Sequence, residues 1–299
     1  MFVAVLLASK QCPPYPYQVR LRLAESLEQF TVIEFTIREG NDAAMKQQNP
    51  LHERLRNDAR FAELEENYFV KDVGFNYWTT GRGKKRGENS IGDRVFYSGS
   101  RRDKKDVPFL KGRDIAKWAI QAPSNYLKHD YATCLDPKID TFRFSEEFLK
   151  IRPKVVYRQT SGSIIAAIDE EGRYLDKTVH MIVPREGWSS SVLSEKTLLG
   201  LLNSRLFDYL YGYISQESEG RAFAQVKTTY IKKLPVPRKE SEHTRKIERL
   251  VSNILHLAPG KKEPLEADLN REVYALFELT SNEIALVEGS QNDESKSRQ

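Results

Sequence analysis

The hydrophobic pattern of this chain changes its period near residue 190, and this change restricts the possible folds most strongly. Residues 152–184 (RPKVVYRQTSGSIIAAIDEEGRYLDKTVHMIVP) contain short apolar runs separated by turn residues, as in strands. Residues 194–215 instead repeat Leu and Tyr at three- and four-residue spacing, which predicts one long core helix with Ser194 as its N-cap. Strands followed by helices predict a mixed α+β fold with a largely antiparallel β part.

Individual elements can be predicted from the same patterns. The strands are expected at 155–157, 164–168 and 179–183, with a turn at 169–172. "LPVP" at 234–237 is expected to be a loop that ends the domain. Helices are expected at 241–257, which has one apolar face, and at about 265–278. Thr280 followed by Glu283 predicts a capping box.

The amino-terminal region predicts an incomplete structure. Residues 2–8 (FVAVLLA) read as a buried strand, although little chain precedes them to supply a neighbour. They are too short for a membrane span, and no positive region precedes them as in a signal peptide. Two more strands are expected within 19–37. Residues 41–66 are polar with few apolar anchors, which predicts a loosely packed linker.

Positive charge is concentrated in one stretch. Residues 81–105 contain nine Lys or Arg and three acidic residues, a local net charge of +6, whereas the whole chain carries +5. Such a local excess indicates a site for a polyanion. The two cysteines exclude a disulfide framework and fit a reducing cytoplasm.

The tetrapeptide Cys12-Pro13-Pro14-Tyr15 has the shape of the catalytic signature of amino-methylating DNA methyltransferases. Those enzymes also need a glycine-containing strand-to-helix turn for S-adenosylmethionine, usually upstream. Only eleven residues precede Cys12, and no such turn stands out downstream. We therefore interpret the tetrapeptide as a proline-rich loop after a strand.

The run Gly81-Arg82-Gly83-Lys84-Lys85-Arg86-Gly87 is the strongest candidate binding motif. It lacks the spacing of a nucleotide-hydrolase phosphate loop. Glycines allow the backbone to approach phosphates closely, and successive cations neutralise them. More cations follow at 101–113, with aromatic residues between, so nucleic-acid binding is favoured over a merely solvated loop.

No metal site or catalytic nucleophile can be identified from this sequence. The five histidines are scattered and form no ligand spacing with the cysteines. Asp169-Glu170-Glu171 could suggest a nuclease carboxylate cluster, but it lies in a predicted hairpin turn, where such residues are common. We expect no metal ligands and no catalytic residues in this chain.

Several motifs from Phe109 to Pro237 together resemble one known family. They are FLKGRDIAKWAI, RPKVVYRQTSGSIIAAIDEEGRYLDKTVHMIV, LLGLLNSRLFDYLY and YIKKLPVP, with REVYALFELTSNEIALVE at 271–288 as the usual following helical segment. Their order and spacing resemble the TaqI-like C-terminal specificity domains of adenine-specific DNA methyltransferases and type IIG restriction–modification enzymes. The resemblance covers roughly residues 68–288.

This resemblance implies a target-recognition domain that binds double-stranded DNA and reads a short sequence, while a methyltransferase domain modifies an adenine. The methyltransferase domain is missing from this sequence, and residues 1–23 resemble its tail. The chain would then be either a fragment or a stand-alone specificity subunit, and the sequence leaves both open. S-adenosylmethionine is expected only on the missing domain or on a methyltransferase partner, and the protein is expected in the cytoplasm without membrane contact.

The domain boundaries follow from these expectations. They are a methyltransferase remnant at 1–40, a linker at 41–66, the DNA target-recognition domain at 67–240, a helical spacer at 241–288 and a disordered tail at 289–299.

The expected DNA contacts divide into two classes. Phosphate contacts are assigned to Lys84, Lys85, Arg101, Arg102, Lys104, Lys105, Lys111 and Arg113. Base reading is assigned to Arg82, Arg86, Arg158 and Gln159, because Arg suits guanine and Gln suits adenine.

Two other function classes stay open. The chain could be a catalyst, a methyltransferase or a nuclease, whose site is not legible here. It could also be a protein-interaction module that uses the helix at 241–257.

Overall fold

A computed structural model describes most of the chain in two compact units. The described residues are 17–24, 30–37, 49–79, 90–215 and 225–296. The first unit is Met1–Glu53 and the second is Arg54–Gln299. The strand predicted at 2–8 and the tetrapeptide Cys12-Pro13-Pro14-Tyr15 lie outside the described residues.

The first unit contains an antiparallel pair of strands, β1 (Tyr17–Ala24) and β2 (Phe30–Ile37). Their register runs from Tyr17 opposite Ile37 to Ala24 opposite Phe30. The two strands predicted within 19–37 are therefore confirmed. The assignment of residues 1–40 to a methyltransferase domain stays a prediction.

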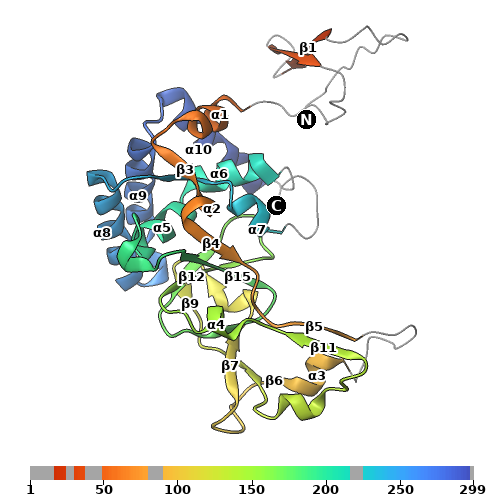
Figure 1. The fold of residues 1–299 in the computed structure, drawn as a ribbon. Coiled ribbons are helices and arrows are strands. Elements are labelled where there is room, and N and C mark those ends of the chain that lie inside the picture. The colour runs from red at the N-terminus through yellow and green to blue at the C-terminus, as the bar shows by residue number, and fades with distance from the viewer. Residues whose placement is uncertain (1–16, 25–29, 38–48, 80–89, 216–224, 297–299) are drawn as a thin grey trace. The chain divides into compact units, whose positions relative to one another are not determined.

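A four-stranded antiparallel sheet lies at the centre of the second unit, in the order β13-β12-β15-β4 (Figure 1). Its strands are β4 (Tyr68–Lys71), β12 (Lys154–Arg158), β13 (Ala166–Asp169) and β15 (Val179–Pro184). Every residue of β15 is buried, and so are Val155, Val156 and Tyr157 of β12, which explains their continuous apolar runs. The three strands and the turn predicted from these runs are confirmed, and Gly172 in the turn has φ +69°.

A second sheet has the order β14-β7-β10-β6, in which only β14 and β7 run parallel. It consists of β6 (Phe96–Ser98), β7 (Val107–Leu110), β10 (Asn125–Leu127) and β14 (Tyr174–Leu175). A two-stranded ribbon, β5 (Asn76–Thr79) and β11 (Asp140–Arg143), lies beside it (Figure 1). The ribbon and the sheet share an aromatic core. Phe75 lies at the centre of this core, with its ring centroid 5.1 Å from Phe109 and 5.5 Å from Phe142.

There are two smaller strand pairs, and one of them corrects a prediction. They are β3 (Phe61–Glu63) with β16 (Pro235–Pro237), and β8 (Ile115–Ala116) with β9 (Ala119–Ile120). "LPVP" is thus mainly a strand and not a loop, because a two-stranded pair tolerates prolines that a central strand would exclude.

The described part of the predicted linker, residues 49–66, is packed and not loose. It contains α1 (Pro50–Asn57), β3 and α2 (Leu64–Asn67). Leu55, Phe61 and Leu64 are buried, so a few apolar anchors suffice to hold this polar segment in place.

The predicted helix at 194–215 is broken into α5 (Glu195–Leu202) and α6 (Arg205–Ser215). The Asn203 side chain accepts a hydrogen bond from the Ala166 amide and donates one to the Ala166 carbonyl, both at 3.0 Å. Ser204 Oγ accepts from the Phe207 amide and begins a new helix. The prediction of one helix was wrong because these two polar side chains bond to backbone groups. Ser194 caps α5 as predicted, accepting from the Thr197 amide.

Three helices complete the second unit: α8 (Glu242–His256), α9 (Glu263–Leu276) and α10 (Ser281–Lys296). α8 buries Ile247, Val251 and Ile254, as its apolar face predicts. Thr280 and Glu283 form the predicted reciprocal cap. α10 continues to Lys296. The disordered tail assigned to 289–299 stays a prediction.

The remaining elements are short. They are α3 (Ile91–Val95), α4 (Glu146–Leu149), α7 (Thr228–Ile231) and the 3-10 turns η1 (Gly112–Asp114), η2 (Tyr131–Cys134), η3 (Trp188–Ser190) and η4 (Pro259–Lys261). Together the elements form mixed, mostly antiparallel sheets with helices, which confirms the predicted α+β class.

Candidate nucleic-acid interface

The glycine-rich basic motif falls outside the described residues. Arg82, Lys84, Lys85 and Arg86 all belong to it, so their assigned roles stay predictions. The chain enters the motif from β5 and leaves it at α3, where Ser90 Oγ caps the helix by accepting from the Asp93 amide.

The connection from β6 to β7, residues 99–106, carries four of the predicted phosphate contacts. It folds around the Asp106 carboxylate, which is 3% exposed. This carboxylate accepts from the Tyr97 hydroxyl at 2.5 Å and from the amides of Asp103 and His129 at 3.1 and 3.0 Å. A buried acid thus fixes the backbone of the loop while its cations stay in solvent.

The four cations of this loop are all exposed but differ in their freedom. Arg101 donates to the carbonyls of Lys104 and Asp106 at 2.5 and 2.6 Å, so part of its guanidinium is committed to the loop itself. Arg102 lies with Cζ 4.4 Å from the centroid of the Tyr97 ring. Lys104 and Lys105 make no side-chain hydrogen bond or ion pair with other described residues, which leaves their charges available for phosphates.

Tyr97 connects the cation layer to the sheet. Its ring stacks on Tyr126 with centroids 5.3 Å apart and an angle of 18°. Its hydroxyl donates to Asp106 and accepts from the Arg102 amide at 2.9 Å. The ring therefore offers a rigid platform on which the planar guanidinium of Arg102 stacks.

Ionisation of the loop's anchor is coupled to His129. Hydrogen bonds from Tyr97 and His129 hold the pKa of Asp106 well below its usual range. The hydrogen bond that His129 Nδ1 donates to the Asp106 carboxylate at 2.9 Å raises the pKa of His129. Asp106 therefore stays ionised at neutral pH and favours the imidazolium form of His129.

Arg113 lies on the 3-10 turn η1 that follows β7, and Lys111 is the N-cap residue of that turn. The Lys111 amide donates to Asp114 at 2.8 Å, and the Gly112 amide donates to Thr178 Oγ1 at 2.9 Å. A Cβ at Gly112 would lie 3.1 Å from the Thr178 carbonyl oxygen, so the backbone of this turn packs closely against Thr178. The Arg113 side chain is 65% exposed, whereas Asp114 is buried beneath the turn.

Arg158 and Gln159 lie near the same turn. The Gln159 amide donates to the Thr178 carbonyl at 2.9 Å, and the Gln159 carbonyl accepts from the Val226 amide at 2.6 Å. Arg158 is only half-buried, but its Nε is buried without a hydrogen-bond partner in the part of the chain that the structure describes. Thr178 thus binds both the η1 turn, through Gly112, and one expected base reader, Gln159.

Asp176 and Thr178 were missed by sequence reasoning. Asp176 is 5% exposed, and burial raises its pKa, whereas Lys111 and Lys177 oppose that rise. Thr178 Oγ1 donates to the carboxylate at 3.1 Å. Their only signal is the tripeptide Asp-Lys-Thr after a strand, which is too common to identify them.

The predicted phosphate contacts that the structure describes therefore lie at the two ends of β7. Arg101, Arg102, Lys104 and Lys105 precede the strand, whereas Lys111 and Arg113 follow it. The predicted residues do not converge on one point.

The nuclease alternative depended on the run Asp169-Glu170-Glu171, and the structure gives Asp169 another partner. Asp169 Oδ2 lies 2.7 Å from Lys154 Nζ with neither side chain exposed, so this acid is neutralised by a structural lysine. The described residues hold no group of three side chains suited to a metal ion.

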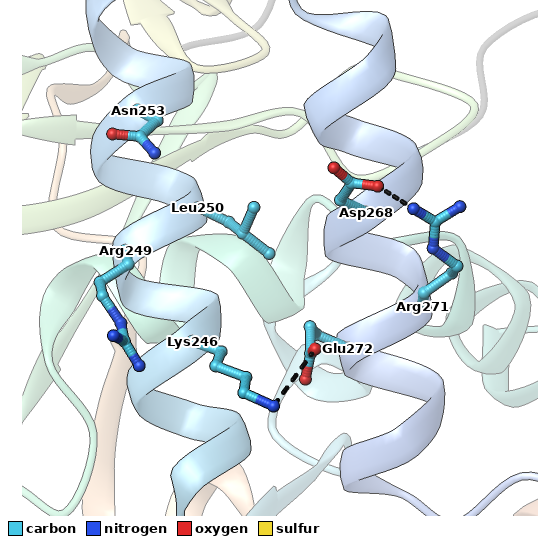
Figure 2. A pocket seen from close by; sticks show the side chains of 7 residues that line it. All are labelled: Lys246, Arg249, Leu250, Asn253, Asp268, Arg271 and Glu272. Atoms are coloured by element: carbon cyan, nitrogen blue, oxygen red, sulfur yellow. Dashed lines mark hydrogen bonds and ion pairs between the residues drawn. The ribbon is translucent and has the colours of Figure 1, made fainter.

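A shallow groove lies between α8 and α9 (Figure 2). Lys246 pairs with Glu272 across it at 3.8 Å, and Arg271 pairs with Asp268 along α9. Leu250 supplies its apolar contact. Because its charges are largely paired with one another, the groove does not have the convergent polar groups of a small-molecule site.

Among the described residues, no helix is long and apolar enough to cross a membrane. A comparison with curated protein sequences finds no match.

Solved structures of restriction–modification proteins are similar to this chain in part. The type IIL restriction–modification enzyme MmeI in complex with DNA has 12% identity and TM-score 0.48, covering 90% of this chain and 40% of MmeI. The type IIG restriction endonuclease BpuSI has 12% identity and TM-score 0.42, covering 83% and 37%. The HsdS subunit from Thermoanaerobacter tengcongensis has 14% identity and TM-score 0.31, covering 76% and 49%. This chain thus spans less than half the length of each.

One family model matches the chain, over less than half of its length. It is the TaqI-like C-terminal specificity domain, and it matches residues 107–236, which include β7 with the KGRD turn, the central strands β12, β13 and β15, and the helices α5 and α6. The predicted resemblance to TaqI-like C-terminal specificity domains is confirmed for residues 107–236.

Proposed function

We propose that this chain recognises a short sequence in double-stranded DNA, as the specificity part of a site-specific adenine DNA methyltransferase or restriction–modification enzyme. The match of residues 107–236 to a specificity domain is the observation that carries this proposal. The exposed cations at both ends of β7 support it, because they provide sequence-independent affinity for phosphates.

Methyl transfer would take place on another domain or subunit that binds S-adenosylmethionine. Within this chain, phosphate contacts come from Arg102, Lys104, Lys105, Lys111 and Arg113, together with Lys84 and Lys85 of the glycine-rich motif. Arg101 contributes mainly by closing its loop. Arg82, Arg86, Arg158 and Gln159 remain the proposed base readers.

The test is binding of the purified chain to a randomised duplex pool over a salt series, with sequencing of the retained DNA. An enriched motif and a steep salt dependence are expected. Salt-dependent binding without a motif would show that sequence reading requires the methyltransferase part. No binding at about 0.1 M salt would contradict the proposal.

Two variants distinguish contacts to DNA phosphates from contacts that read bases. Replacing Lys104 and Lys105 by alanine should weaken binding to all sequences alike and reduce the salt slope by about 0.9 for each lost contact. Gln159→Ala should instead relax preference at one position, if Gln159 reads a base. Lys261→Ala, which removes an exposed cation from η4, is the control and should change neither property.

A further inference from the structure

The ribbon of β5 and β11 presents an outer face that the predicted contacts do not include. Tyr77 pairs with Phe142 in the register, and both rings pack into the aromatic core around Phe75. Because side chains alternate along a strand, the neighbouring pairs, Trp78 with Thr141 and Asn76 with Arg143, point the other way. Trp78 and Arg143 therefore share the outer face.

This ribbon is held rigidly to the rest of its sheet region. The Asp140 side chain is fully buried, and it accepts from Arg94 at 2.6 Å and from Thr79 Oγ1 at 2.8 Å. Thr79 directly follows Trp78, and Asp140 lies three residues before Arg143. The backbone beneath the outer pair thus has little freedom to move.

Trp78 is 43% exposed, one of three large apolar residues exposed among those described. The guanidinium of Arg143 lies over its indole, with Cζ 5.5 Å from the ring centroid. Core packing gives no reason for an indole in this position, because the inner face of β5 already supplies the core contact through Tyr77.

The Arg143 guanidinium makes no hydrogen bond or ion pair with any other described residue. This contact with the ring uses none of the guanidinium N–H groups in a hydrogen bond, so they have no partner among the described residues. It also restricts the side chain, so less rotamer entropy is lost when those donors bind a ligand. A planar fork of free donors matches two oxygens of a phosphate.

We propose that Arg143, held by Trp78, is a bidentate contact to a phosphate of the DNA backbone. This inference rests on the proposed function. A DNA phosphate is favoured over an acidic protein because β5 ends two residues before Gly81, where the run of Arg82, Lys84, Lys85 and Arg86 begins. The same type of pair occurs in the β6–β7 loop, where Arg102 stacks on Tyr97.

The test measures binding of the full chain to a mixed-sequence DNA duplex over a salt series. Arg143→Ala should weaken binding about tenfold and reduce the salt slope by about 0.9. Arg143→Lys should keep the slope but lose affinity, because lysine retains the charge without the planar fork. Arg271→Ala on α9, whose side chain is 75% exposed, is the matched control and should bind like the parent.

A double-variant cycle tests the role of the indole. Trp78→Ala should weaken binding by less than Arg143→Ala, and the double variant should bind no worse than Arg143→Ala alone. Additive losses would show that the two residues act separately and would overturn the positioning role of Trp78. Unfolding curves of all variants should coincide with the parent curve, since both side chains lie on the outer face.

Three outcomes separate this inference from the proposed function. Absence of DNA binding by the parent chain would overturn both. Binding by the parent with unchanged affinity and slope in Arg143→Ala would overturn the inference and leave the proposed function standing. Unchanged DNA binding in Arg143→Ala together with a lost protein interaction would instead assign this face to an acidic partner.

Discussion

Lys154 Nζ lies 2.7 Å from the carboxylate of Asp169, and neither side chain is exposed. The same ammonium donates to the carbonyls of Leu149 and Ile151 at 2.6 and 3.2 Å. The carboxylate also accepts from the Arg173 amide at 2.7 Å. This pair joins β12 to the end of β13, so the lysine of the Pro-Lys-Val-Val-Tyr motif is structural and does not contact DNA.

Lys154→Met should lower the free energy of unfolding by about 3–5 kcal/mol, because it leaves a buried carboxylate without its main partner. Urea unfolding measures this change. The double variant Lys154→Met with Asp169→Leu should recover part of the loss. Lys150→Met, which breaks an exposed pair with Glu146, is the control and should cost less than about 1 kcal/mol. Equal effects of Lys154→Met and Lys150→Met would contradict the structural role.

Asn203→Ala should destabilise the second unit by roughly 1–3 kcal/mol, because the buried backbone amide and carbonyl of Ala166 would each lose a hydrogen bond to the Asn203 side chain. Urea unfolding is again the measurement. Asn253→Ala provides the comparison, because Asn253 is exposed on α8 and should change stability by less than about 0.5 kcal/mol. A neutral Asn203→Ala would show that the break between α5 and α6 does not depend on this bond.

Gly200→Ala should also destabilise the protein, by about 1–3 kcal/mol. A Cβ at this position would lie 2.8 Å from Ile247 Cγ2 and 2.9 Å from Val251 Cγ2, both on stiff β-branched side chains of α8. This clash outweighs the gain of up to about 1 kcal/mol that alanine brings to a helix. Thermal unfolding compares it with Gly260→Ala, where a Cβ would meet nothing within 4 Å.

The pair of His129 and Asp106 predicts a pH dependence of stability. The pKa of His129 is raised above its ordinary 6.5 by its hydrogen bond to Asp106. Its contribution to stability is therefore fully present below pH 6.5 and is lost as the pH rises through the raised pKa. His129→Gln should remove this part of the dependence, so the difference in Tm between parent and variant should shrink from acidic to alkaline pH. A constant difference would contradict the assignment.

Local patterns were sufficient for most elements. Ile247, Val251 and Ile254 are spaced for one helix face, and that face is buried in α8. Thr280 and Glu283 cap α10 as their spacing predicts. Such predictions succeed because the interactions lie within four residues of one another along the chain.

Other predictions failed where a distant partner decided the outcome. Residues 194–215 have helical periodicity throughout, but Ala166 on β13 binds Asn203 and the helix breaks there. "LPVP" has the composition of a loop, but β3 pairs with it as a strand. In both cases a partner more than thirty residues away supplies the hydrogen bonds.

The sequence by itself determined the α+β class, the cationic character of residues 81–105 and the resemblance that residues 107–236 bear out. Only the tertiary structure decided which charges are free. Arg101 is bound within its own loop and Lys154 is buried with Asp169, whereas Arg143 lies over the Trp78 ring without a hydrogen-bond partner among the described residues. Charge is a property of each residue, but its availability depends on the neighbours that folding brings within hydrogen-bond distance.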